Sequence, residues 1–169
     1  MPPRTTQSWI SSTATSADLA QHGFGRCNVW HLPDEDIDAA ITRTTQGHCY
    51  EDPFFFLSTP SLYADPGVLA PAGCTTVQIN VASDFGYFDR AVQQGTHATE
   101  KARVTREILT AVERRLIPEL TRHCVVQGSW TPVDLAQRVG LVRGAMYLSL
   151  IHISEPTRLR RISYAVFCL

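Results

Sequence analysis

The sequence predicts an α+β fold, with a mixed, largely antiparallel sheet and helices packed on it. Polar and apolar residues alternate over residues 75–81, which is typical of a half-buried strand. Apolar residues recur at helical spacing over residues 99–117. The expected order of elements, β-β-α-β-β-α-β-α, has mixed connections. It therefore favours α+β over a doubly wound parallel sheet.

The first half of the chain contains two expected strands and one expected helix. The strands are predicted over residues 7–13 and 26–31, and Trp30 lies on the opposite face of its strand from Cys27 and Val29. The acidic run Asp34-Glu35-Asp36 follows Pro33 and precedes apolar residues at helical spacing. Because negative charge stabilises the start of a helix, this run predicts a helix N-terminus.

The second half is predicted to supply the rest of the sheet and its main helix. Residues 54–57 form a continuous apolar run, which predicts a strand buried on both faces. Turn residues separate this run from residues 75–81, so the two strands are expected to be antiparallel. The long helix should end at Pro118. A strand over residues 123–127 and a helix over residues 132–139 complete the order. The apolar stripe of the long helix is Val104, Ile108, Leu109, Val112 and Leu116.

Composition excludes several classes of function. The chain carries 15 basic and 16 acidic residues, and Lys101 is its single lysine. A nucleic-acid-binding surface needs clustered positive charge, so no nucleic-acid partner is expected. No apolar run approaches the length of a transmembrane helix, and the N-terminus lacks the apolar stretch of a signal peptide. The widely spaced cysteines favour reduced thiols and a cytoplasmic location.

Residues 148–169 resemble translated DNA from a sequencing-library adapter. Two blocks, residues 148–158 and 162–169, match fixed parts of such an adapter in one reading frame. Leu159-Arg160-Arg161 falls where a variable index barcode sits. We therefore expect no native structure from this segment and interpret residues 1–147, which we expect to be cut off within a domain. The segment carries three Arg and one Glu, so the remaining residues have a net charge of −3.

Short motifs give little support for specific chemistry. Gly23-Phe24-Gly25 begins like a dinucleotide-binding fingerprint, but Asn28 replaces the third glycine and no helical run follows, so a surface turn is expected. The histidines and cysteines lack the paired spacing of zinc ligands, and no metal site is predicted. His48 beside Cys49 is a poor activated thiol, because neighbouring side chains on an extended segment point apart.

The aromatic residues are the most informative candidates for a site. Most of them lie on or beside predicted strands, where packing in the core is the default role. The sharper alternative is that they line a pocket for a large apolar ligand. The candidates for such a lining are Trp30, Phe54, Phe56 and Tyr147. No catalytic residue is assigned.

Several segments together resemble the carboxy-terminal half of phytoene desaturase-like flavoproteins, which include carotenoid desaturases, carotene isomerases and retinol saturases. The resemblance covers nearly all of residues 1–147, and Met146 stands where a branched aliphatic residue is expected. The segments that carry it, in order, are Ala17 to His31, Pro53-Phe54-Phe55-Phe56-Leu57-Ser58-Thr59-Pro60-Ser61, Asp65-Pro66, Ala70-Pro71-Ala72-Gly73, residues 75–81, Thr131-Pro132-Val133-Asp134-Leu135, Gly140 and Arg143-Gly144-Ala145-Met146-Tyr147.

This resemblance implies an FAD-dependent oxidoreductase that acts on C–C bonds of apolar polyene or isoprenoid-like substrates. The Gly-x-Gly-x-x-Gly flavin unit of that group does not occur in the sequence. We therefore expect residues 1–147 to be a partial substrate domain of a two-domain flavoprotein, inactive and unable to hold FAD by itself, with a risk of aggregation. The parent enzyme would be cytoplasmic, with peripheral membrane contact possible.

Two alternatives stay open. One is a fragment of another flavoenzyme of the amine-oxidase group, whose pocket would show more polar anchors. The other is a non-enzymatic domain that binds apolar ligands. The sequence does not determine the substrate, the hydride acceptor or the oligomeric state.

Overall fold

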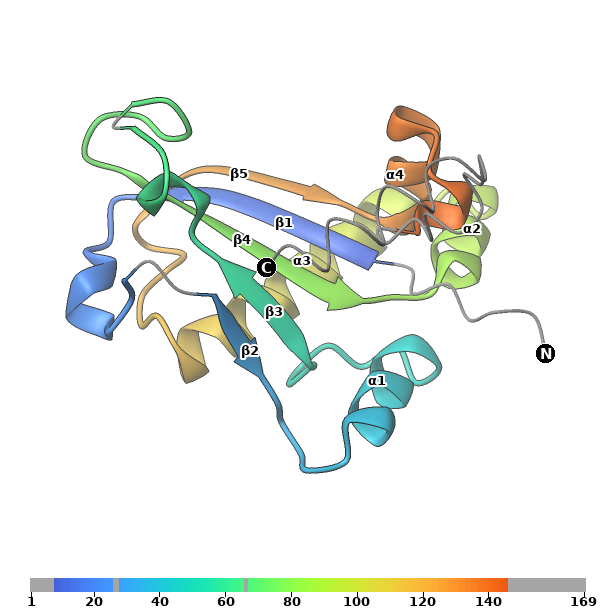
Figure 1. Ribbon diagram of the computed structural model, residues 1–169. Helices are drawn as coiled ribbons and strands as arrows, with labels where there is room; N and C mark the ends of the chain where they lie inside the picture. The colour runs from blue at the N-terminus through green and yellow to red at the C-terminus, as the bar shows by residue number, and fades with distance from the viewer. Residues whose placement is uncertain (1–7, 26–27, 66, 146–169) are drawn as a thin grey trace, which may run out of the picture.

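The computed structural model describes residues 8–25, 28–65 and 67–145, which form one antiparallel sheet with helices on one face and at one end (Figure 1). The strand order is β2-β3-β4-β1-β5, and every described strand pair is antiparallel. The predicted α+β class is confirmed. In chain order the strands and α-helices are β1 (Ser8–Thr15), β2 (Val29–His31), α1 (Ile37–Thr45), β3 (Phe55–Ser58), β4 (Thr75–Ala82), α2 (Phe85–Gln93), α3 (His97–Arg115), β5 (Cys124–Trp130) and α4 (Pro132–Val139).

The N-terminal strand occupies an inner position in the sheet. β1 pairs with β4 from Ser8↔Ala82 to Thr15↔Thr75, and on its other side it pairs with β5. A segment from the start of the chain therefore joins two strands that lie far later in the sequence. Local sequence patterns predict each of these strands but carry no information on this insertion.

One face of the sheet packs against α3, which crosses behind the strands in Figure 1. The apolar side chains of β3, β4 and α3 that meet there are almost completely buried. They are Phe55, Leu57, Val77, Ile79, Val81, Val104, Ile108 and Val112. Burial of an aliphatic or aromatic side chain of this size contributes about 1.5–3 kcal/mol. This layer is the main core of the described chain.

The prediction that residues 54–57 are buried on both faces is wrong. Within β3 the burial alternates: Phe55 and Leu57 are fully buried, whereas Phe56 and the preceding Phe54 are half-buried. The physical reason is that α3 covers one face of the sheet only. A run of large apolar residues can therefore form a strand with one open face.

Side-chain caps fix the starts of three helices. Asp36 accepts a hydrogen bond from the amide of Ala39 at the start of α1, and Thr131 and Asp134 form a reciprocal capping box on α4. Asp84 accepts hydrogen bonds from two amides at the start of α2, a helix that the sequence patterns did not predict.

The helices α1, α2 and α4 gather at one end of the sheet (Figure 1). Among the described helices, none is long and apolar enough to cross a membrane.

Candidate functional site

Three of the four predicted lining residues lie together in the structure. The ring centroids of Trp30 and Phe56 are 4.7 Å apart, and those of Trp30 and Phe54 are 5.7 Å apart. Trp30 is 56 % exposed, so this group forms an accessible apolar surface, which we call the aromatic surface. Tyr147, the fourth predicted residue, lies outside the described residues.

The register of β2 and β3 brings these side chains together. Trp30 is paired directly with Phe56, and directly paired residues present their side chains to the same face of a sheet. Phe55 and Leu57 alternate with Phe56 and point to the opposite face, where α3 packs. The aromatic surface therefore lies on the sheet face that α3 leaves uncovered.

A buried polar residue lies next to the aromatic surface. Asn80 of β4 is paired with Phe56 and is 8 % exposed, and its Oδ1 atom has no hydrogen-bond partner among the described residues. A buried carbonyl oxygen without a partner is costly. The remaining side chains of the surface are apolar and do not titrate. The aromatic surface therefore offers apolar contact, and its own side chains carry no group for proton transfer.

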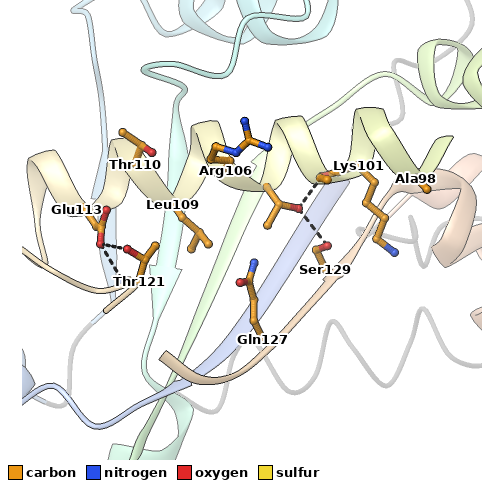
Figure 2. A pocket seen from close by; sticks show the side chains of 11 residues that line it. Ala98, Lys101, Arg106, Leu109, Thr110, Glu113, Thr121, Gln127 and Ser129 are labelled. Carbon is orange, nitrogen blue, oxygen red and sulfur yellow. Dashed lines mark hydrogen bonds between the residues drawn. The ribbon is translucent and has the colours of Figure 1, made fainter. Parts of the chain in front are cut away.

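A second feature is a groove of about 630 Å³ between α3 and the edge strand β5 (Figure 2). One continuous face of α3 supplies most of its lining, and Gln127 and Ser129 of β5 point towards that face. The aromatic surface contributes no side chain to it. The α3 residues that line this groove are Ala98, Lys101, Ala102, Thr105, Arg106, Leu109, Thr110 and Glu113.

Hydrogen bonds hold two points of the groove. The hydroxyl of Thr105 donates to the carbonyl of Lys101 at 2.7 Å and lies 3.1 Å from the hydroxyl of Ser129, which links α3 to β5. At the other end, Glu113 accepts hydrogen bonds from the amide and the hydroxyl of Thr121. These hydrogen bonds tie α3 to β5 at one point of the groove and to Thr121 at the other.

Lys101 at the rim of the groove is paired with Asp134 of α4 at 2.8 Å. Burial opposes ionisation of Asp134, but hydrogen bonds from Lys101 and from Thr131 outweigh it and lower the pKa of this carboxyl. The ion pair and the capping box therefore share one carboxylate, which fastens the start of α4 to α3.

A polar cluster joins the loop after α1 to α2 and α3. His48 stacks on Tyr87 with ring centroids 4.1 Å apart, and the Tyr87 hydroxyl donates to Glu100 and accepts from Arg103 at 3.0 Å. Burial is the main cause that lowers the pKa of His48, and the positive charges of Arg90 and Arg103 act in the same direction, against Asp84. Sequence patterns missed this cluster because its members are spread over residues 48–103.

The described residues do not fit the flavin cofactor implied by the resemblance. Gly23 ends a short 3-10 helix in a left-handed conformation, with φ of 78°, and Gly23-Phe24-Gly25 is not followed by a helix N-terminus. Because a dinucleotide site needs a strand, a tight turn and a helix N-terminus in succession, this segment cannot form one. A surface turn is predicted at Gly23-Phe24-Gly25; the turn is present and both glycines are exposed, but Phe24 is buried and packs in the core. Within the described ranges, no group of three or more His, Cys, Asp or Glu side chains is placed to hold a metal ion.

Comparison with known proteins gives no family assignment. No protein-family model matches the chain, and no curated protein matches it in sequence.

Proposed function

We propose that this chain forms part of the substrate domain of an FAD-dependent oxidoreductase of the phytoene desaturase-like group, and that its aromatic surface contacts an apolar polyene or isoprenoid-like substrate. The observation that carries the proposal is the gathering of Trp30, Phe54 and Phe56 on the sheet face opposite α3. Flat conjugated molecules pack well against such rings, because each aromatic contact adds about 0.5–1.5 kcal/mol beyond its buried area. The proposed location of the enzyme is the cytoplasm.

In this proposal the flavin, when bound, supplies the transfer of hydride, and the chain positions the polyene and excludes water from it. Since the described residues do not fit FAD, none of them is assigned to the flavin. The roles of Trp30, Phe54 and Phe56 are therefore in substrate binding, and no catalytic residue is proposed.

The binding part is tested with the complete chain and β-carotene dispersed in detergent micelles. We expect the carotenoid to elute with the protein on gel filtration and to quench tryptophan fluorescence. Trp30→Ala and Phe56→Ala should each weaken binding by about fivefold, the equivalent of one lost aromatic contact. Tyr63→Ala is the matched control, since Tyr63 is 51 % exposed and has no ring contact with Trp30, Phe54 or Phe56 among the described residues. Equal binding by Trp30→Ala and the unchanged chain would contradict the proposal.

The enzymatic part is tested on the source DNA, by sequencing on both sides of codons 1–147. We expect an in-frame flavin fingerprint upstream and a Gly-rich flavin-contacting segment downstream. Stop codons directly before Met1 and directly after Tyr147 would rule out the oxidoreductase. If the chain still bound β-carotene in that case, the proposed function would become that of a non-enzymatic carrier of apolar ligands.

A further inference from the structure

The strand β5 has an open edge. Within the described residues it pairs only with β1 and lies at the end of the strand order. The carbonyl of Val126 accepts a hydrogen bond from the Thr13 hydroxyl of β1 at 2.8 Å, so the backbone of Val126 faces β1. Backbone groups alternate in direction along an antiparallel strand, so those of Gln127 and Ser129 face outward. Such a row of amide and carbonyl groups can pair with another extended chain.

The groove lies directly beside this open edge. The side chains of Gln127 and Ser129 point into it, and α3 forms its other wall (Figure 2). A strand added to the edge of β5 would direct every second side chain towards α3, because successive side chains alternate between the faces of a sheet. The edge would then supply backbone hydrogen bonds, and the groove would select side chains.

The charged residues that line the groove differ in their partners. Lys101 forms an ion pair with Asp134, whereas Glu113 keeps its negative charge and accepts hydrogen bonds from the amide and hydroxyl of Thr121 at the far end of the groove. Arg106 is exposed on the groove face of α3 and has no ion-pair partner among the described residues. An acidic side chain of a partner would form an ion pair with Arg106.

We propose that β5 and α3 together bind an extended peptide segment with acidic side chains, which adds to the sheet as a new edge strand and places a carboxylate against Arg106. This inference is independent of the oxidoreductase proposal, because it uses the opposite edge and the opposite face of the sheet from the aromatic surface.

The probe is a fluorescein-labelled eight-residue peptide in which Glu alternates with Val, compared with the same peptide carrying Lys in place of Glu. Fluorescence anisotropy with the complete chain should show binding of the Glu peptide at least about tenfold tighter than that of the Lys peptide, and weaker binding at high salt. Arg106→Glu should remove or reverse this preference. Gln127→Pro should weaken both peptides, because proline removes an outward amide and leaves the ladder to β1 intact.

Arg138→Glu, the same charge change at an exposed position of α4 outside the groove, is the control and should bind like the unchanged chain. Circular dichroism verifies that each variant is folded. Equal affinity for the two peptides, or an unaltered preference in folded Arg106→Glu, would overturn the proposal. A third outcome would also overturn it: neither peptide binds, the chain sediments as a dimer, and Gln127→Pro dissociates that dimer. In that case β5 would pair with a second copy of the chain.

Discussion

His48 occupies a position where three physical constraints meet. Its φ of 51° is a left-handed conformation, its ring stacks on Tyr87, and its Nδ1 atom is buried with no hydrogen-bond partner among the described residues. Protonation would place a third positive charge beside those of Arg90 and Arg103. The neutral ring is therefore the form that the folded chain accommodates.

We expect acid to destabilise the chain through His48. Because the folded pKa is lowered, the unfolded chain binds the proton more readily, and stability is lost as the pH falls below about 6.5 towards the folded pKa. His48→Asn should reduce this loss, since asparagine tolerates a left-handed backbone and does not titrate. Urea unfolding at pH 7.5 and 5.5 measures the difference. The exposed control His22→Asn should retain the full pH dependence, and an unchanged dependence in His48→Asn would refute the assignment.

Phe88 is a fully buried anchor of α2. Its ring packs at an edge-to-face angle against Tyr87 and His97, which ties α2 to the start of α3. Phe88→Ala should lower the free energy of unfolding by about 3–5 kcal/mol, because it leaves a cavity in a close-packed core. Val92→Ala, at an exposed position of the same helix, should cost less than about 0.5 kcal/mol. Denaturant unfolding of the two variants distinguishes a core role for Phe88 from a general effect on α2.

The elements at the end of the described chain depend on two glycines of different kinds. Gly140 ends α4 with φ of 71°, and a Cβ atom there would meet nothing within 4 Å. Gly144 has φ of 65°, and its Cβ would lie 2.3 Å from the carbonyl oxygen of Pro132. Both positions disfavour side chains, but only Gly144 also makes a close backbone contact.

Gly140→Ala should therefore cost about 1 kcal/mol, the usual penalty for a side chain at a left-handed helix end. Gly144→Ala should cost clearly more, because the backbone of Pro132 has to move. Thermal or urea unfolding of the two variants gives the comparison. If both variants lost the same free energy of unfolding, the close contact between Gly144 and Pro132 would not be a source of stability.

Individual elements could be predicted from local signals, with instructive exceptions. The helix over Pro132–Val139 is predicted with its observed bounds, and in the structure Thr131, Pro132 and Asp134 fix its start. The helix α2 was missed, since Gly86 and the adjacent aromatic residues hide its helical period and its start depends on Asp84. Predicted strand ends differ by several residues, as β5 continues to Trp130 and not to Gln127.

The candidate sites likewise combine residues that the sequence predicts with an arrangement that it does not. The choice of Trp30, Phe54 and Phe56 came from residue type, but their contact depends on the register of β2 against β3. The groove beside β5 could not be predicted, because it exists only where β1 holds β5 opposite α3. A signal was nevertheless present: the side of α3 that lines the groove carries small and polar residues over residues 98–113, with Leu109 as the exception.

At the scale of the whole molecule, the adapter-like segment leads to a simple prediction. Deletion of residues 148–169 should leave the free energy of unfolding of the remaining chain unchanged within about 0.5 kcal/mol, as for surface changes that remove no core contact. Paired urea titrations of the complete and shortened chains measure this. A larger loss would show that the segment contributes to the fold and would contradict its origin in adapter DNA.

The sequence by itself determined most of the segments that form strands and helices, the α+β class and the charge balance, because alternation, helical period and caps act between near neighbours. The tertiary structure decided the position of β1 between β4 and β5, the open face that carries the aromatic surface, and the groove at the edge of β5. The position of β1 and the groove depend on pairing between residues at least 60 positions apart, as in Ser8↔Ala82 and Thr13↔Gln127, and the aromatic surface depends on the register Trp30↔Phe56. Local propensity does not encode such pairing, which is selected by the burial of one shared apolar face.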